Sequence, residues 1–149
     1  MKMRAVLGMA TAAIAVSLVG TATASADPVN PNDYLIGNTV YFNAGPAQCS
    51  IGPDGTTGCD IAPGIAKWLD MIPVTDLAID VPFLPAHPTF GVFGAYGRSD
   101  AQWLGQGPNG YGSTISYAGA TCSGGGRGGI SCNSKGHSFS FGWSGTQTN

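Results

Sequence analysis

Residues 121–141, TCSGGGRGGISCNSKGHSFSF, contain two cysteines that are separated by nine residues, with Arg127 midway between them in a run of glycines. Glycine accepts backbone conformations that other residues avoid, so the run favours a tight reversal of the chain. A hairpin folded at Arg127 places Cys122 opposite Cys132. The glycines with Arg127 also resemble an anion-binding nest, but the lysine and the helix of a phosphate loop are missing. The sequence therefore favours a hairpin.

The residues after this hairpin predict a strand with one buried aromatic face. HSFSFGW, residues 137–143, alternates aromatic residues with serine and glycine at a period of two. Successive side chains of a strand point to opposite faces, so one face is apolar and the other is wet. The predicted buried residues are Phe139, Phe141 and Trp143.

The other two cysteines repeat the same spacing. CSIGPDGTTGC also has nine residues between its cysteines, Cys49 and Cys59, and a proline-aspartate-glycine turn lies at its centre. Four cysteines allow three pairings, and the spacing favours two local disulfides, Cys49–Cys59 and Cys122–Cys132. The alternative is a metal site of four thiolates, but zinc ligands come in much closer pairs.

The N-terminus has the features of a secretory signal peptide over residues 1–26. Lys2 and Arg4 precede an apolar stretch that ends in Ala-Ser-Ala, a small-residue cleavage site. The apolar stretch is shorter than the roughly 20 residues of a membrane-spanning helix. We expect cleavage after Ala26, no later transmembrane segment, and a secreted, extracellular or cell-envelope location in which disulfides persist.

The remaining chain, residues 27–149, has the length of one domain and few charges. Eight aspartates outnumber its four basic residues, and glutamate is absent. Nucleic-acid binding and polybasic membrane binding both need a basic patch, so neither is expected. The abundance of glycine, proline and aromatic residues favours strands and turns. We predict a mostly β fold: a small antiparallel sheet, or a sandwich- or barrel-like domain, with two disulfide-stapled hairpins.

The middle and the ends of this domain are less regular in sequence. Residues 63–73 carry apolar side chains at helical spacing, which predicts a short helix or an irregular apolar segment. A strand is expected near Leu77–Val81 and another over residues 89–97, with three prolines between them. The fold of residues 63–110 is left open by this irregular, proline-rich pattern. Residues 27–33 are expected to form a loose leader and residues 144–149 a polar tail.

Both ends of the mature chain resemble one family. TVYFNAGPAQCSIGPDGTTGCDI and, far downstream, YGSTISYAGATCSGGGRGGISCNSKGHSFSFGW resemble a domain of unknown function that is common in secreted actinobacterial proteins. The resemblance rests on the cysteine spacing together with the Gly136-His137-x-Phe139 phrase. It implies export and disulfides, and it implies no activity. The chain departs from the family at Ser138, where relatives usually have glycine, and it lacks a further cysteine pair in the middle.

His137 is the only weak candidate for a catalytic residue. Serines lie beside it and aspartates lie elsewhere, but the G-x-S-x-G elbow of many hydrolases is absent. A small secreted hydrolase that uses His137 is therefore the alternative to a non-enzymatic function. No cofactor or metal site is predicted. The histidines are far apart, and the Asp54–Asp60 stretch departs from a calcium loop, although a weak calcium site there stays open.

A binding surface is the leading hypothesis. VPFLPAHPTFGVFG, residues 81–94, places large apolar side chains among prolines. Exposed apolar patches often mark binding sites, whereas the alternative is that this segment completes the core. We expect a non-enzymatic extracellular or cell-envelope protein with a binding or structural role and an unidentified partner. The candidate binding residues are Phe83, Leu84, Phe90 and Phe93.

Overall fold

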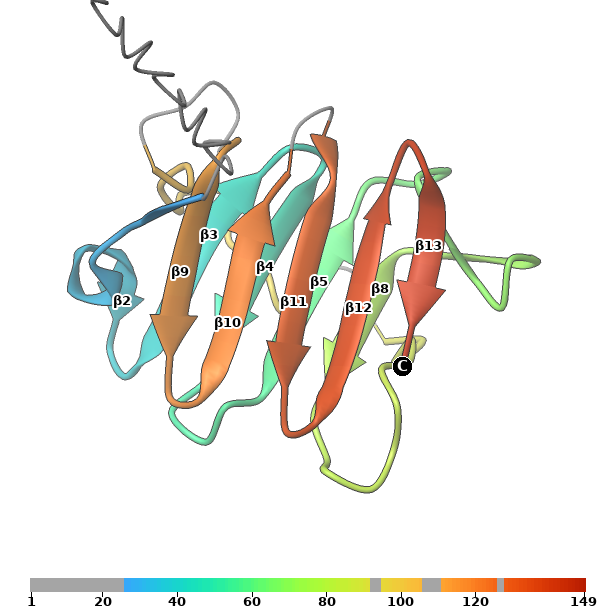
Figure 1. Cartoon of the computed structure of the whole chain (residues 1–149), viewed down its shortest axis with the longest axis horizontal. Helices are drawn as coiled ribbons and strands as arrows, with labels where there is room; N and C mark the ends of the chain where they lie inside the picture. Colours follow the sequence, from blue (N-terminus) through green and yellow to red (C-terminus); the bar gives the residue numbers. More distant parts are fainter. Residues whose placement is uncertain (1–25, 92–94, 106–110, 126–127) are drawn as a thin grey trace, which may run out of the picture.

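The computed structural model describes residues 26–91, 95–105, 111–125 and 128–149. Two sheets stack face to face in these residues, with the strands of the second sheet behind those of the first (Figure 1). The prediction of a mostly β fold is confirmed, and the architecture is a sandwich. No helix in the described ranges is both long and apolar enough to cross a membrane.

The first sheet has the strand order β1-β9-β10-β11-β12-β13. Its strands β9 to β13 follow one another along the chain and pair antiparallel, whereas β1 pairs parallel with β9. The bounds are β1 Asp27–Pro28, β9 Ser113–Tyr117, β10 Ala120–Gly124, β11 Ile130–Ser134, β12 His137–Gly142 and β13 Gly145–Thr148.

The second sheet has the order β2-β3-β4-β5-β8 and is antiparallel throughout. A 3-10 turn, η1, precedes it, and a separate hairpin of β6 and β7 lies between β5 and β8 in the chain. The bounds are η1 Pro31–Tyr34, β2 Leu35–Ile36, β3 Thr39–Ala44, β4 Ala47–Ile51, β5 Thr57–Ile61, β6 Ala66–Trp68, β7 Ile72–Val74 and β8 Asp76–Ile79.

Both local disulfides are confirmed. Cys49 lies directly opposite Cys59 in the β4–β5 pair, and Cys122 lies directly opposite Cys132 in the β10–β11 pair. Directly opposed residues of antiparallel strands point to the same face, which lets their sulfurs meet. Each sheet therefore has one of its own hairpins closed by a covalent bond.

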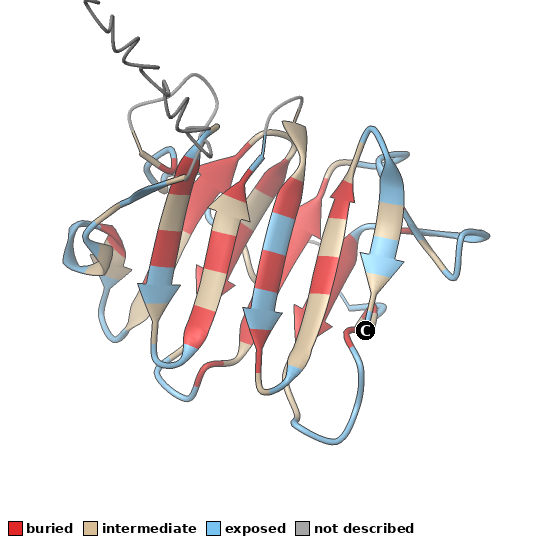
Figure 2. Ribbon diagram, viewed as in Figure 1, coloured by how far each residue is buried: buried red, intermediate tan, exposed pale blue. Residues whose placement is uncertain are grey.

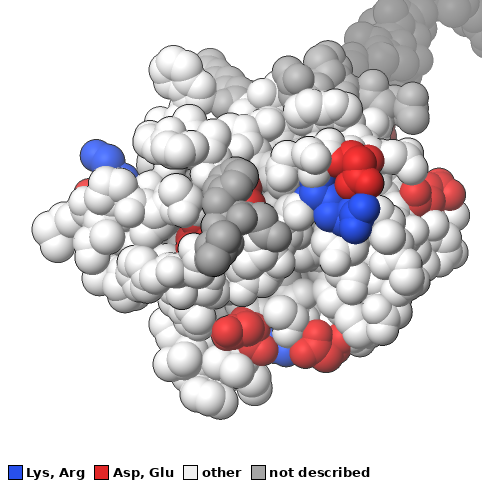
Figure 3. All heavy atoms as spheres, turned by 180° about the vertical axis from the view of Figure 1, so that it is seen from behind, with Lys and Arg blue, Asp and Glu red and all other residues white. Residues whose placement is uncertain are grey.

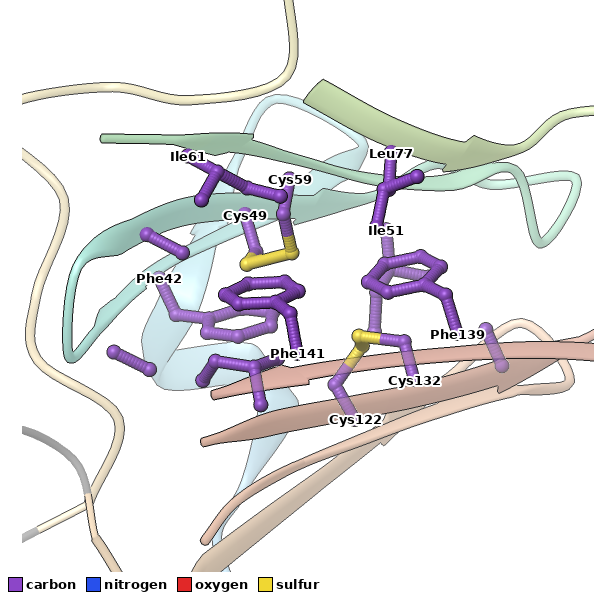
Figure 4. Close-up of a cluster of buried hydrophobic side chains, with 14 of the residues drawn as sticks. Phe42, Cys49, Ile51, Cys59, Ile61, Leu77, Cys122, Cys132, Phe139 and Phe141 are labelled. Atoms are coloured by element: carbon purple, nitrogen blue, oxygen red, sulfur yellow. A yellow bond between two sulfur atoms is a disulfide. The ribbon is translucent and has the colours of Figure 1, made fainter. Parts of the chain in front are cut away.

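The two disulfides face each other across the core. Figure 4 shows the bridges projecting from opposite sheets, with the rings of Phe139 and Phe141 between the layers. Phe42, Ile51 and Leu77 complete the packing from the second sheet and are wholly buried. In β10 and β11, buried residues alternate with less buried ones (Figure 2), as expected of strands with one face on the core. The two disulfides are therefore part of the hydrophobic core between the sheets.

The expected loose leader and polar tail are both corrected by the structure. Residues 27–33 add β1 to the first sheet and then form most of η1. Residues 144–149 include β13, and the backbone of Asn149 exchanges hydrogen bonds with Ser138. An unpaired strand edge offers backbone donors and acceptors to any extended segment, so these polar residues pair without an apolar pattern of their own.

The expected helix over residues 63–73 is wrong, because this segment forms the β6–β7 hairpin. Leu69 and Asp70 form the turn, both with positive φ, and Leu69 is 60% exposed. An isolated helix of this length is unstable unless it packs, whereas β6 gains a backbone hydrogen bond from Lys67 to the hydroxyl of Thr146. The strand expected over residues 89–97 is also absent from its described part, residues 89–91 and 95–97.

Candidate functional site

A cleft opens at the end of the sandwich where several hairpin turns meet, the upper end in Figure 1. Its cavity volume is about 390 Å³. The turn residues come from the β3–β4, β10–β11 and β12–β13 connections and from the segment between β5 and β6. We call this cavity the turn-end cleft, and its lining consists of Pro46, Gly64, Ile65, Tyr111, Gly128, Gly142 and Trp143.

Glycines let these turns approach one another closely. A Cβ atom on Gly142 would lie 2.8 Å from the Cα of Gly129, which is closer than side chains tolerate. A Cβ on Gly45 would lie 3.2 Å from the carbonyl oxygen of Gly128. The glycines that the sequence assigns to a hairpin bend therefore have a second role, since they let the turns approach one another closely.

Trp143 is the most exposed large apolar residue of the described chain, at 89%. The sequence predicted it on the buried face with Phe139 and Phe141, and only those two are buried. The alternation ends at Gly142, whose φ of +155° starts the β12–β13 turn and carries Trp143 out of the sheet. A glycine before an aromatic residue was the one signal in the sequence that the strand ends there.

The described residues of the turn-end cleft offer a partner apolar and hydrogen-bonding contacts but no ion pair. Its described lining holds no aspartate, histidine, lysine or arginine. The indole of Trp143 offers a flat apolar face, and the phenol of Tyr111 offers a hydrogen-bonding group. Pockets that combine aromatic walls with a few polar groups are the usual form of small-ligand and peptide sites.

His137 lies at the opposite end of the sandwich, at the start of β12. Its Nε2 atom lies 3.1 Å from the carbonyl oxygen of Pro82, and its Nδ1 atom is buried without a hydrogen-bond partner among the described residues. A catalytic histidine is oriented by a carboxylate and faces a nucleophile. Within the described ranges, the ring of His137 contacts no carboxylate, so the structure does not assemble a triad around it.

Three of the four predicted binding residues are exposed, and none of these three lines the turn-end cleft. Phe83 and Phe90 are 77% and 70% exposed and Leu84 is 44% exposed, so these three do not complete the core. Phe90 packs edge-to-face on Trp68, with ring centroids 6.3 Å apart. Phe93 lies outside the described residues. Binding at these side chains stays a prediction.

Lys135 occupies the place where the sequence left a weak calcium site open. Its ammonium group lies 3.4 Å from Oδ2 of Asp54, 3.2 Å from the hydroxyl of Thr56 and 2.9 Å from the carbonyl oxygen of Asp80. The Thr56 backbone N–H and hydroxyl, followed by Lys135, lower the pKa of Asp54 to about 2. The ammonium group of Lys135 therefore supplies the positive charge beside these oxygens. In the described ranges, no cluster of metal-ligating groups is found.

Comparisons of the chain with protein-family models, curated proteins and solved structures find no match. The resemblance to secreted actinobacterial domains thus gains no support from them, and the function has to be argued from the molecule itself.

Proposed function

We propose that this chain is an exported, non-enzymatic binding protein of the extracellular space or cell envelope, and that it holds its partner at the turn-end cleft. The observation that carries the proposal is the exposed indole of Trp143 beside a cavity whose described lining residues carry no charge. Burying an exposed aromatic ring yields more binding free energy than burying most other side chains, and aromatic residues dominate the energetics of interfaces.

The framework suits a binding role because the cleft is built on covalently closed hairpins. Cys122–Cys132 closes the hairpin whose turn contributes Gly128. The strand β12, which pairs with β11 of this hairpin, ends at Gly142 directly before Trp143. A preorganised site loses little conformational freedom when it binds, which favours affinity. The partner that fits is an uncharged, partly apolar segment of an extracellular or envelope molecule.

Export is supported by the N-terminal pattern and by the position of Asp27. Its backbone nitrogen donates a hydrogen bond of 2.7 Å to the carbonyl oxygen of Gly112, at the edge of the first sheet. Cleavage after Ala26 leaves this nitrogen as a charged amino group in the same position, where it still donates. We expect intact-mass analysis of the exported protein to find residues 27–149 with no free thiol. A retained leader or four free thiols would contradict the export proposal.

Site-specific photo-cross-linking tests the binding proposal. One variant replaces Trp143 with the photoreactive amino acid benzoylphenylalanine, and a matched variant replaces Phe83, which is similarly exposed but lies in the loop after β8. Each oxidised variant is irradiated in the secreted and envelope fractions of the producing cells. A cross-link to one defined molecule from position 143 and none from position 83 is expected. A cross-link from position 83 alone would overturn the cleft as the site, and none from either would overturn the binding proposal.

A further inference from the structure

The outer face of the second sheet carries a row of polar side chains that crosses neighbouring strands. Asn43 on β3 lies opposite Gln48 on β4, Gln48 lies opposite Asp60 on β5, and Asp60 lies opposite Asp76 on β8. Trp103 extends the row at its other end through a parallel bridge to Asn43. Because strand side chains alternate, these residues point away from the core that the neighbouring residues of each strand fill.

One end of this row is closed by the chain that runs over it. Oδ2 of Asp60 accepts hydrogen bonds from the backbone N–H groups of Tyr96, at 3.0 Å, and Gly97, at 2.6 Å. Oδ2 of Asp76 accepts from the N–H of Thr89 at 2.8 Å. Burial, followed by nearby carboxylates, raises the pKa of Tyr96. The two carboxylates therefore hold the covering segment in place, and they are not free to contact a ligand through these oxygens.

The other end of the row is open. A cavity of about 340 Å³ lies over Asn43 and Gln48, beside the half-exposed indole of Trp103. Figure 3 views the molecule from behind, where red and blue side chains lie in separate groups on a mostly white surface. We call this cavity the Trp103 pocket, and its lining consists of Asn43, Gly45, Pro46, Ala47, Gln48, Ser99, Ala101 and Trp103.

The side-chain oxygen of Asn43, which lines this pocket, accepts no hydrogen bond from the described residues. Its Nδ2 atom donates to the carbonyl oxygen of Ala101 at 2.7 Å, which fixes the amide orientation because two oxygens cannot share a hydrogen bond. Its Oδ1 atom has no hydrogen-bond partner within the described ranges, although the residue is only 8% exposed. Buried acceptors in folded proteins are nearly always paired, so this oxygen is an unusual unsatisfied polar atom beside the pocket.

We propose that the Trp103 pocket binds one unit of a neutral saccharide. The indole face of Trp103 packs against the C–H face of the sugar ring. Sugar hydroxyls bond to the amide of Gln48 and to the hydroxyl of Ser99, which both line the pocket. These groups both donate and accept, which matches hydroxyl groups better than a purely apolar ligand.

The charges around the pocket favour a neutral sugar over an acidic one. Its described lining holds no cationic side chain. Arg98 lies next to Ser99 in the chain, but its guanidinium makes two hydrogen bonds to Asp100 and lies 5.6 Å from the ring centroid of Tyr41. A carboxylate- or sulfate-bearing sugar finds no unpaired cation among these residues, so charged saccharides gain no ion pair here.

The Trp103 pocket is separate from the turn-end cleft, and among the described residues their linings have only Pro46 in common. The two proposals therefore fail independently. The probes are soluble oligosaccharides of glucose, mannose, galactose and arabinose, with oligogalacturonate as the anionic control. Binding to the oxidised protein, residues 27–149, is measured by isothermal titration calorimetry and by the shift of the three indole N–H signals in ¹H–¹⁵N NMR spectra.

The expected result is binding of at least one neutral oligosaccharide, with a shifted Trp103 indole signal, and no binding of oligogalacturonate. The variant Trp103→Ala weakens this binding about tenfold or more, because ring stacking contributes roughly that factor. Met71→Ala, at an exposed residue outside both cavities, is the control and leaves the affinity unchanged, whereas Trp143→Ala tests the turn-end cleft as the alternative site. Gln48→Ala gives a smaller loss and checks the amide contribution. The thermal midpoint of each variant establishes that it is folded.

Three results would overturn the inference. The first is that no neutral oligosaccharide binds. The second is that Trp103→Ala binds the oligosaccharide as tightly as the unaltered protein does. The third is that Trp143→Ala abolishes the binding and Trp103→Ala does not. The last result would move the saccharide to the turn-end cleft. A failure of the cross-linking experiment at position 143 would leave the titration result at position 103 unaffected.

Discussion

Removing one disulfide tests whether the cross-links hold the sandwich together. The change is the double substitution of Cys49 and Cys59 by alanine, compared with the same double substitution of Cys122 and Cys132. Both bridges have a sequence separation of 10 residues. For a loop of that length, the chain-entropy relation gives about 2.7 kcal/mol of stability from restricting the unfolded chain. The two bridges are therefore expected to contribute equally.

Alanine also removes sulfur atoms from the core, and a control separates this effect. All four cysteines are wholly buried, so each double alanine variant leaves a void that costs about 1 kcal/mol or more. Chemical reduction of the unaltered protein breaks the bridges but keeps the sulfur atoms. We expect reduction to remove the cross-link contribution alone, and alanine substitution to cost more per bridge.

Urea unfolding of the oxidised protein and the two variants, followed by tryptophan fluorescence, measures these differences. Each variant is expected to lose roughly 3–4 kcal/mol of unfolding free energy. The thermal midpoint is expected to fall by roughly 10–20 °C for a domain of this size. A loss below about 1 kcal/mol for either bridge, or a difference above about 1.5 kcal/mol between them, would refute the chain-entropy reasoning.

Two further predictions concern the outer face and the Lys135 cluster. A Cβ on Gly58 would lie 2.3 Å from the Tyr96 ring, so Gly58→Ala should displace that ring and cost about 1–3 kcal/mol in urea unfolding, and an unchanged midpoint would contradict this packing. The Asp54 pKa of about 2 means that its stabilising contribution is complete above roughly pH 4 and is lost as the pH falls through 2. In NMR titrations Lys135→Met should raise this pKa only slightly, because the N–H and hydroxyl of Thr56 lower it more; a return to 3.8 would show that Lys135 dominates.

The sequence by itself determined the two hairpins, because everything that defines them is local. Each cysteine pair is symmetric in sequence about a central residue, Asp54 or Arg127, and antiparallel pairing of the flanking strands brings the sulfurs together. The alternation of Phe139 and Phe141 likewise fixed the buried face of β12. The composition favoured strands and turns over helices. These inferences needed no knowledge of what the strands pack against.

The tertiary structure decided which residues the strand pattern leaves exposed. Residues 63–73 have an apolar period that fits a helix, but prolines bound the segment and β13 offers a partner beside it, so a hairpin forms and Leu69 stays in solvent. Trp143 continues the aromatic alternation in the sequence, yet the turn at Gly142 carries it out of the core.

The candidate sites also depended on tertiary contacts. The row from Trp103 to Asp76 draws on five separate segments, and no spacing in the sequence relates Trp103 to Asn43. The turn-end cleft depends on glycines from different hairpins meeting at one end of the sandwich. The local residue pattern determines where a strand forms and where the chain turns. Which strands become neighbours depends on burying both sheets against each other, and that choice determined where the pockets lie.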